Sequence, residues 1–127
     1  WTADGEIYVQ SCGDRIPNGG NVVARPIQIT FGAQETPEAC IRHGVADFVA
    51  QEEMDRYRGF WWHPDSTGIL FVRVDESAVP PFRILHHDAA TGGGDDAQSS
   101  AIPYEDHRYP FAGKENPAVK LAFVQVD

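Results

Sequence analysis

Two apolar segments joined by a short turn constrain the fold of this chain more than any other feature. FWWHP leads into the turn HPDSTG, and GILFVRVDES follows directly after it. Pro64 presets φ for the turn, and the side chain of Asp65 can accept hydrogen bonds from the backbone ahead of it. The pattern predicts a β-hairpin around this turn and makes an all-β fold the first expectation.

Strand patterns also reach both ends of the chain. Ile7 and Val9 fall on one face of a strand-like segment in ADGEIYVQS, and Val119, Leu121 and Phe123 alternate with other residues in AVKLAFVQVD. Because both ends fall inside such patterns, we expect these 127 residues to be a fragment of a longer polypeptide.

Two internal segments complete the expected strands. RPIQITF at residues 25–31 predicts a short strand, and PPFRILHH at 80–87 predicts another, which Pro80 and Pro81 restrict to a sheet edge or a strand start. Residues 88–101 contain Gly, Asp and Ser but no apolar residue larger than Ala, so burial cannot offset their ordering entropy. We expect a flexible insertion there.

A weak internal repeat leaves two interpretations open. WTADGEIYV at residues 1–9 and WHPDSTGILFV at residues 62–72 share a Trp, an Asp turn and an apolar strand. Propeller blades repeat a hairpin of this kind every 40 to 50 residues or so, and loop insertions can lengthen the spacing. A chance match of two aromatic hairpins explains the pattern equally well.

One stretch predicts a short helix, VADFVAQEEMDRY, in which Asp47 can act as the N-cap. It carries two adjacent glutamates, Glu52 and Glu53, shortly before Trp61 and Trp62. On a strand the two tryptophans point to opposite faces, so one can fill the core while the other lines a cavity near the glutamates. Core packing of both is the more common arrangement and the stronger expectation.

The acidic pair has two interpretations. Adjacent helical residues point about 100° apart, so Glu52 and Glu53 can straddle a cationic ligand lying beside the helix. Alternatively, Glu52, Glu53, Asp55 and Arg56 form a solvated lattice of charges on an exposed helix, with Arg56 moderating the repulsion between the two glutamates. For an arbitrary protein the lattice is the more common arrangement.

Composition excludes several partners. The formal net charge is −9, with ten basic residues scattered among nineteen acidic ones, so affinity for nucleic acid through phosphate neutralisation is not expected. No stretch approaches the 18 to 20 or so apolar residues that span a bilayer. We therefore expect neither a nucleic-acid partner nor a membrane segment in this chain.

No metal, cofactor or catalytic residue is expected. Cys12 and Cys40 lack metal-ligand spacing, and His86 and His87 are adjacent on a strand and point apart. The Asp pair in GGGDDA lacks the spaced ligands of a calcium loop. No serine lies in a G-x-S-x-G elbow.

The segment GVADFVAQEEMDRYRGFWWHPDSTGILFVRVDESAVP, residues 44–80, closely resembles the β-propeller domain of the dipeptidyl peptidase IV family of serine exopeptidases. Its V-x-Q-E-E-x-D-R run before the aromatic pair is most similar to the cytosolic dipeptidyl peptidases and their bacterial relatives. RYPFAGKENPAVKLAFVQV, residues 108–126, resembles the start of the next blade in that family.

The resemblance implies a fold and a role for the acidic pair. Residues 1–127 would form part of a β-propeller of antiparallel blades, with one short helix carrying Glu52 and Glu53. In this family such a pair projects into the internal cavity and holds the free α-amino group of the peptide substrate. An α-ammonium is largely protonated at neutral pH and offers three donors that two carboxylates can share.

It also implies partners outside this chain. Catalysis would belong to an α/β-hydrolase domain of the same polypeptide, which releases X-Pro or X-Ala dipeptides from peptide N-termini. Residues 81–110 correspond to an arm used in homodimer formation, although the insertion at 88–101 puts its contacts in doubt. A non-catalytic propeller acting as a protein-binding or scaffolding module is the alternative.

The cysteines and the missing glycosylation sequon favour the cytosol, with export as the other possibility.

Overall fold

The predicted hairpin lies at the centre of the largest sheet. Strand β6 (Phe60–Trp62) pairs antiparallel with β7 (Gly68–Asp75). In the turn between them, an Asp65 carboxylate oxygen accepts hydrogen bonds of 3.0 Å from Thr67 N and 2.5 Å from Thr67 Oγ1. The computed structural model describes residues 1–11, 25–36, 39–85 and 104–126.

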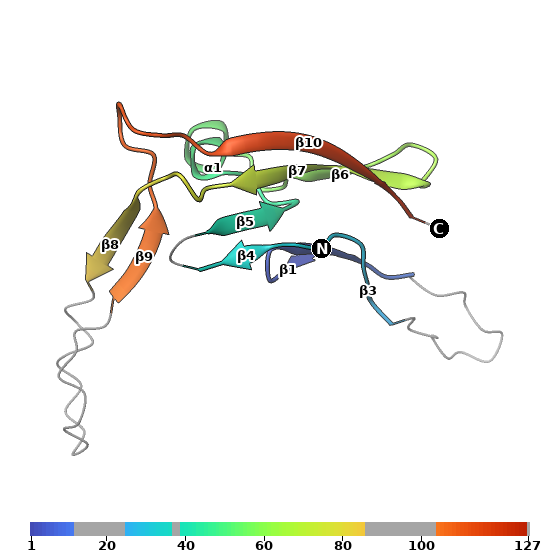
Figure 1. Ribbon diagram of the computed structural model, residues 1–127. Helices are drawn as coiled ribbons and strands as arrows, with labels where there is room; N and C mark the ends of the chain where they lie inside the picture. Colours follow the sequence, from blue (N-terminus) through green and yellow to red (C-terminus); the bar gives the residue numbers. More distant parts are fainter. Residues whose placement is uncertain (12–24, 37–38, 86–103, 127) are drawn as a thin grey trace, which may run out of the picture.

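The largest sheet places β7 between the C-terminal strand and two shorter ones (Figure 1). β10 (Ala118–Gln125) pairs with every residue of β7, from Ala118 opposite Asp75 to Gln125 opposite Gly68. On the other edge of β7 lie β6 and β5 (Cys40–His43), and β4 (Gln34–Glu35) pairs with β5. All of these pairings are antiparallel.

Strands β5 and β6 are two parts of one line along this edge of β7. The Gly44 N–H donates to the carbonyl of Val72, and the Val72 N–H donates to the carbonyl of Gly59, each at 2.8 Å. The hydrogen-bonded ladder therefore continues from β5 to β6 across Val72, while residues 45–58 leave the sheet between them. This excursion contains the helix α1 (Phe48–Met54).

A second sheet covers one face of the first. It consists of β1 (Thr2–Ala3), β2 (Glu6–Val9) and β3 (Ile27–Gln28). Because side chains alternate along a strand, Ile69 and Phe71 of β7 point to the same face. The core between the sheets consists of Ile7, Ile69 and Phe71, packed against Val9, Ile29, Phe60, Ala122, Val124 and Val126.

A buried polar group links the two sheets beside this core. Glu6, Thr30 and His43 are all buried. One Glu6 carboxylate oxygen accepts a 2.6 Å hydrogen bond from Thr30 Oγ1 and lies 2.9 Å from His43 Nδ1, while the other accepts from Ala33 N at 2.6 Å. Burial alone would raise the pKa of Glu6, but the bonds from Thr30, Ala33 and His43 outweigh it and lower that pKa.

The face of β7 and β10 that points away from the second sheet is apolar and partly exposed. The register places Leu70, Phe123 and Trp61 on this face, together with Val119 and Leu121. Each of the five is at least 40% exposed, and Leu121 is 67% exposed. We call these five residues the open face.

A two-stranded hairpin extends away from both sheets (Figure 1). It pairs β8 (Pro81–Leu85) with β9 (Tyr104–Arg108), and a bidentate ion pair joins Arg83 to Asp106 across the strands at 2.7 Å. The prolines were expected to limit this strand to a sheet edge or to mark its start, and the structure begins β8 at Pro81 and places it in a sheet of two strands. β9 was not expected, because its sequence YEDHR has no apolar alternation.

The all-β expectation is confirmed, and the described residues contain the one helix that was expected. The strands differ from the expectation: the one expected at 25–31 is limited to Ile27–Gln28, and β4 and β5, like β9, were not anticipated. The expected insertion at 88–101, the histidines 86 and 87, the aspartates 95 and 96 and Cys12 lie outside the described residues. Within the described part of the chain, no helix has the length and apolar character needed to span a bilayer.

Candidate functional site

The excursion at residues 45–58 leaves the sheet through a narrow antiparallel neck. Gly59 N donates to Gly44 O at 3.0 Å, Ala46 N donates to Tyr57 O at 3.1 Å, and Val45 bridges Arg58. Glycine is required at the start of the neck, since Gly44 has φ of +70° and a Cβ there would lie 2.7 Å from Ile7. The neck therefore holds both ends of the excursion in place.

Helix α1 begins and ends at local signals within the excursion. The Asp47 side chain accepts a hydrogen bond from Ala50 N at 3.4 Å, as expected for the N-cap. The helix stops at Asp55, whose left-handed backbone, with φ of 50°, closes the last turn as Arg56 N donates to Ala50 O at 3.0 Å. Gln51 also binds back to the neck through Ala46 O at 2.7 Å.

Glu52 and Glu53 lie in the last turn of α1, and both are exposed. Within residues 1–11, 25–36, 39–85 and 104–126, neither carboxylate makes a hydrogen bond or an ion pair. The last turn of the helix contains no basic residue. Both acids therefore lie at the negative end of the helix dipole, where a cation is favoured and an anion is not.

The alternative arrangement, a lattice of charges on the helix, does not form. Asp55 and Arg56 lie beyond the last helical residue. Arg56 instead approaches Asp47 at 3.8 Å and donates to Arg58 O at 3.4 Å, so it does not moderate the repulsion between Glu52 and Glu53. The acidic pair is thus left uncompensated by its own helix.

The tryptophan pair contributes less to the core than expected. Trp61 is 42% exposed and Trp62 is 49% exposed, so neither fills the core. The preceding residue, Phe60, packs against the core in their place. Trp61 lies on the open face because it stands opposite Leu70, and Trp62 stands opposite Ile69 near the end of the pairing.

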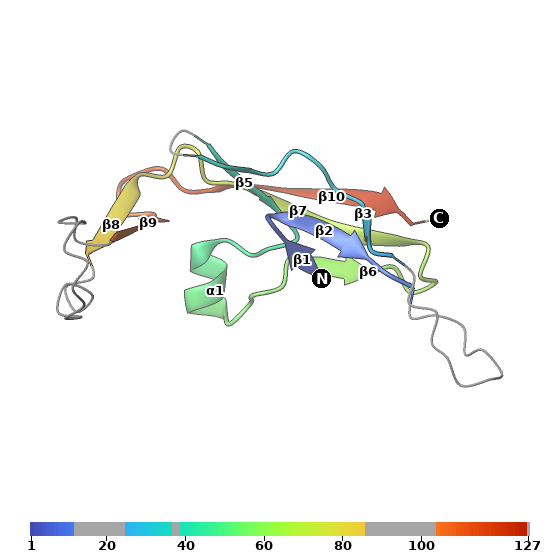
Figure 2. The same ribbon diagram turned by 90° about the horizontal axis from the view of Figure 1, so that it is seen from below.

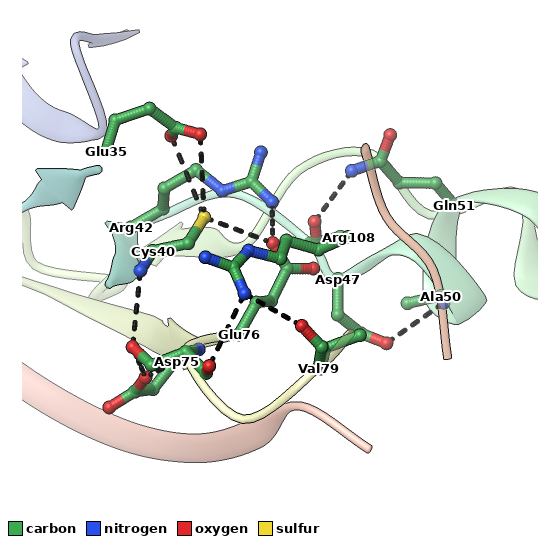
Figure 3. A network of polar contacts seen from close by, with 12 residues as sticks. Glu35, Cys40, Arg42, Asp47, Ala50, Gln51, Asp75, Glu76, Val79 and Arg108 are labelled. Carbon is green, nitrogen blue, oxygen red and sulfur yellow. Dashed lines mark hydrogen bonds and ion pairs between the residues drawn. The ribbon is translucent and has the colours of Figure 1, made fainter. Parts of the chain in front are cut away.

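A cavity of about 620 Å³ borders α1 on another side, lined in part by Phe48 and Gln51 of the helix. Opposite them, a network joins the buried Cys40 and Glu76 to the partly exposed Arg42 (Figure 3). Arg42 forms an ion pair with the fully buried Glu76 carboxylate, and Cys40 Sγ lies 3.4 Å from the same carboxylate. The network links β5 to the turn after β7, next to the helix, and we call these three residues the brace.

The electrostatics of this brace disfavour a reactive thiol. Burial, with the negative charges of Glu35 and Glu76, raises the pKa of Cys40 to about 12. The pKa of Arg42 is also raised: burial would lower it, but the charge of Glu76 outweighs that effect. A protonated thiol beside two carboxylates is not a nucleophile, and we assign Cys40 a structural role.

Sequence reasoning did not find this brace, because its members come from β5 and from the turn after β7 and share no motif. The nearest signal was the run Asp75, Glu76 and Ser77, in which Asp75 accepts a 3.1 Å hydrogen bond from Ser77 N and fixes the turn. No group of three or more metal-binding side chains occurs among the described residues.

Comparisons with known proteins agree on one family. The family described as the dipeptidyl peptidase IV (DPP IV) N-terminal region matches residues 3–127. A probable dipeptidyl-aminopeptidase B of Arthroderma otae is 30% identical over 129 residues, which cover 99% of this chain and 13% of the relative. A probable dipeptidyl peptidase 4 of Emericella nidulans is 36% identical over 89 residues, covering 66% of this chain and 10% of the relative.

A solved structure extends the match to three dimensions. The crystal structure of Porphyromonas gingivalis dipeptidyl peptidase 4 superposes with a TM-score of 0.68 and 25% sequence identity, over 95% of this chain and 14% of that one. The chain thus spans 10–13% of these curated relatives and forms part of a β-propeller of antiparallel strands. It belongs to the dipeptidyl peptidase IV family, within the N-terminal region.

Proposed function

We propose that this chain is the substrate-recognition part of a longer serine exopeptidase that removes dipeptides from peptide N-termini, and that Glu52 and Glu53 bind the substrate α-amino group. The observation that carries the proposal is the uncompensated acidic pair on a helix that projects from the sheet. Membership of the dipeptidyl peptidase family supports peptides as the substrate class.

The local electrostatics favour a cation at this position. Two adjacent carboxylates repel each other and also face the negative end of the helix dipole, so the free helix carries an unfavourable arrangement. A primary ammonium relieves both effects, because its three N–H donors can reach two carboxylates at once. Arg56, the basic residue that follows the helix, is already engaged by Asp47 and Arg58.

The position of the helix suits a ligand held beside the propeller sheet. The neck at residues 44–46 and 57–59 fixes the excursion at both ends, and α1 borders a cavity through Phe48 and Gln51. An amine held by Glu52 and Glu53 would fix the start of the peptide. A nucleophile about two residues away, roughly 7 Å along an extended chain, would then release dipeptides and reject blocked N-termini.

The remaining parts of this enzyme are proposed to lie outside the chain. The nucleophile and its partners would come from an α/β-hydrolase domain of the same polypeptide. The β8–β9 hairpin would be the base of an arm that contributes to a homodimer. The preference for proline or alanine at the second substrate position would depend on a pocket in the catalytic domain.

The test uses the full-length protein and an X-Pro substrate with a chromogenic leaving group. We expect Glu52→Gln and Glu53→Gln each to lower kcat/KM by about tenfold or more, mainly through KM, because each removes a charge-assisted hydrogen bond. Asp55→Asn is the matched control. It removes the same charge from the same excursion, and Asn also tolerates the left-handed conformation.

The outcomes separate the proposal from its alternatives. Wild-type kinetics in both glutamine variants would refute the role of the acidic pair. An equal loss in Asp55→Asn would indicate a general field of negative charge rather than a specific site. A full-length protein that binds peptides with free N-termini without cleaving them would indicate a non-catalytic binding propeller.

A further inference from the structure

Helix α1 depends on contacts outside itself. It has seven residues, of which only Ala50 is buried. An isolated helix of fewer than about 12 residues is not stable in water, so tertiary contacts must hold this one. On the side of Phe48 and Gln51 the helix borders the cavity of about 620 Å³ instead of a packed core. Few contacts are therefore left to decide where Glu52 and Glu53 lie.

One of these contacts joins α1 to a distant part of the sequence. The ring of Phe48, the first helical residue, meets the ring of Tyr109 edge to face, with centroids 5.0 Å apart. Tyr109 in turn lies 4.7 Å from Phe111 and 6.3 Å from Phe82, and Phe82 meets Phe111 at 5.8 Å. We call these four residues the aromatic cluster. Offset and edge-to-face geometries of this kind are the favourable ones for aromatic rings.

The other side of the cluster is fixed to the base of the β8–β9 hairpin. Tyr109 directly follows β9, and its N–H donates to Pro80 O at 3.3 Å. The neighbouring Arg108 donates to the carbonyls of Val79 at 2.9 Å and of Ser77 and Thr36 at 3.4 Å. Figures 1 and 2 show α1 and the hairpin toward the same end of the large sheet. Tyr109 thus stands between a firmly bonded hairpin base and a weakly held helix.

We propose that Tyr109 is a positioning residue for the acidic pair: through Phe48 it couples the place of α1 to the place of the β8–β9 hairpin. The inference rests on the proposed role of Glu52 and Glu53. Movement of the hairpin base, for example by a partner bound to the hairpin, would then change the affinity for a substrate amine. This coupling would act through the ring contacts and not through the sheet, because the hydrogen bonds of Gly44 and Gly59 to Val72 keep the sheet continuous on either side of the excursion.

The kinetic test compares three variants of the full-length protein. Tyr109→Ala removes the ring and should raise KM for a substrate with a free N-terminus by about twofold to tenfold, with kcat unchanged, because one aromatic contact is lost. Tyr109→Phe should restore wild-type KM, since the Tyr109 hydroxyl makes no hydrogen bond to any described residue. Tyr104→Ala is the matched control: this tyrosine lies in the same hairpin and stacks on Arg83, away from α1.

A second measurement reads the contact directly. Amide hydrogen exchange of residues 48–54 should become faster in Tyr109→Ala than in the wild type, Tyr109→Phe or Tyr104→Ala. In a Glu53→Gln background, Tyr109→Ala should raise KM by a smaller factor, because one of the two positioned carboxylates is gone. Unchanged exchange in Tyr109→Ala, or fully additive effects on KM, would overturn the inference.

The two proposals fail separately. If Glu52→Gln and Glu53→Gln leave KM unchanged, the proposed function is wrong, and the exchange data alone decide whether Tyr109 holds α1. If the glutamine variants do raise KM while Tyr109→Ala does not, the acidic pair binds the amine without help from the aromatic cluster. A lowered kcat with unchanged KM in Tyr109→Ala would likewise overturn the positioning role.

Discussion

Gly59 offers the sharpest test of the idea that the neck places the helix. A Cβ at this position would meet the Val72 side chain and would lie 2.9 Å from the Gly44 carbonyl carbon and 3.0 Å from that of Val45. Two of these neighbours are backbone, which cannot rotate away. Gly59→Ala must therefore push the two sides of the neck apart.

The expected magnitude follows from the cost of overpacking. Inserting a methyl group into a tightly packed site typically destabilises a protein by about 1–3 kcal/mol. As a shift in an equilibrium, this corresponds to a factor between about fivefold and about 150-fold. The part of the strain that is relieved by moving the excursion should appear as a raised KM, and the rest as a lower free energy of unfolding.

The assay combines urea unfolding and steady-state kinetics of the full-length protein, with Gly68→Ala as the control. A Cβ at Gly68 would meet the Phe123 ring and lie 2.8 Å from Val124 O, so this variant is overpacked as well, but at the far end of β7. We expect both variants to be destabilised and only Gly59→Ala to raise KM. Equal KM values in the two variants, or wild-type stability of Gly59→Ala, would refute the reasoning.

Two further predictions concern the core and the open face. Because the folded state lowers the pKa of Glu6, its carboxylate stabilises the protein above the unfolded pKa near 4.5, and this contribution is lost as pH falls through the lower folded value. In urea titrations, Glu6→Gln should lower the free energy of unfolding by about 1.5–3 kcal/mol at pH 7. It should also weaken the loss of stability on acidification, and an unchanged pH dependence below pH 4.5 or so would contradict the role of Thr30 and His43. The isolated chain should self-associate through the open face, and Leu121→Asp should shift it toward monomer in light scattering; a monodisperse wild-type monomer would argue against this.

Local chemistry accounts for what the sequence predicted well. The side chains of Asp65 and Asp47 accept hydrogen bonds from backbone N–H groups two and three residues ahead. The turn and the helix start that they stabilise can therefore be predicted from the neighbouring residues alone. The alternation of Val119, Leu121 and Phe123 likewise predicted the strand that became β10. These features need no knowledge of the rest of the fold.

The features that the sequence did not predict depend on distant pairings. Alternation correctly placed Trp61 and Trp62 on opposite faces, but only the position of the second sheet (β1–β3) decides that the face of Phe60 is the covered one. The strand β9 is polar throughout and is defined by its pairing with β8, including the contact between Arg83 and Asp106. For the acidic pair, the sequence predicted the helix and the exposed, adjacent carboxylates but placed Arg56 wrongly, since the helix ends before it.

The junction at Val72 has a consequence for how such proteins diversify. Since Gly44 and Gly59 both bond to this one residue, the ladder beneath the excursion is complete whatever lies between them. We therefore expect residues 47–56, between the two sides of the neck, to tolerate changes in length and chemistry while the blade keeps its register. Grafting a loop of different charge between the two glycines should therefore change which ligand end-group is recognised without redesigning the scaffold.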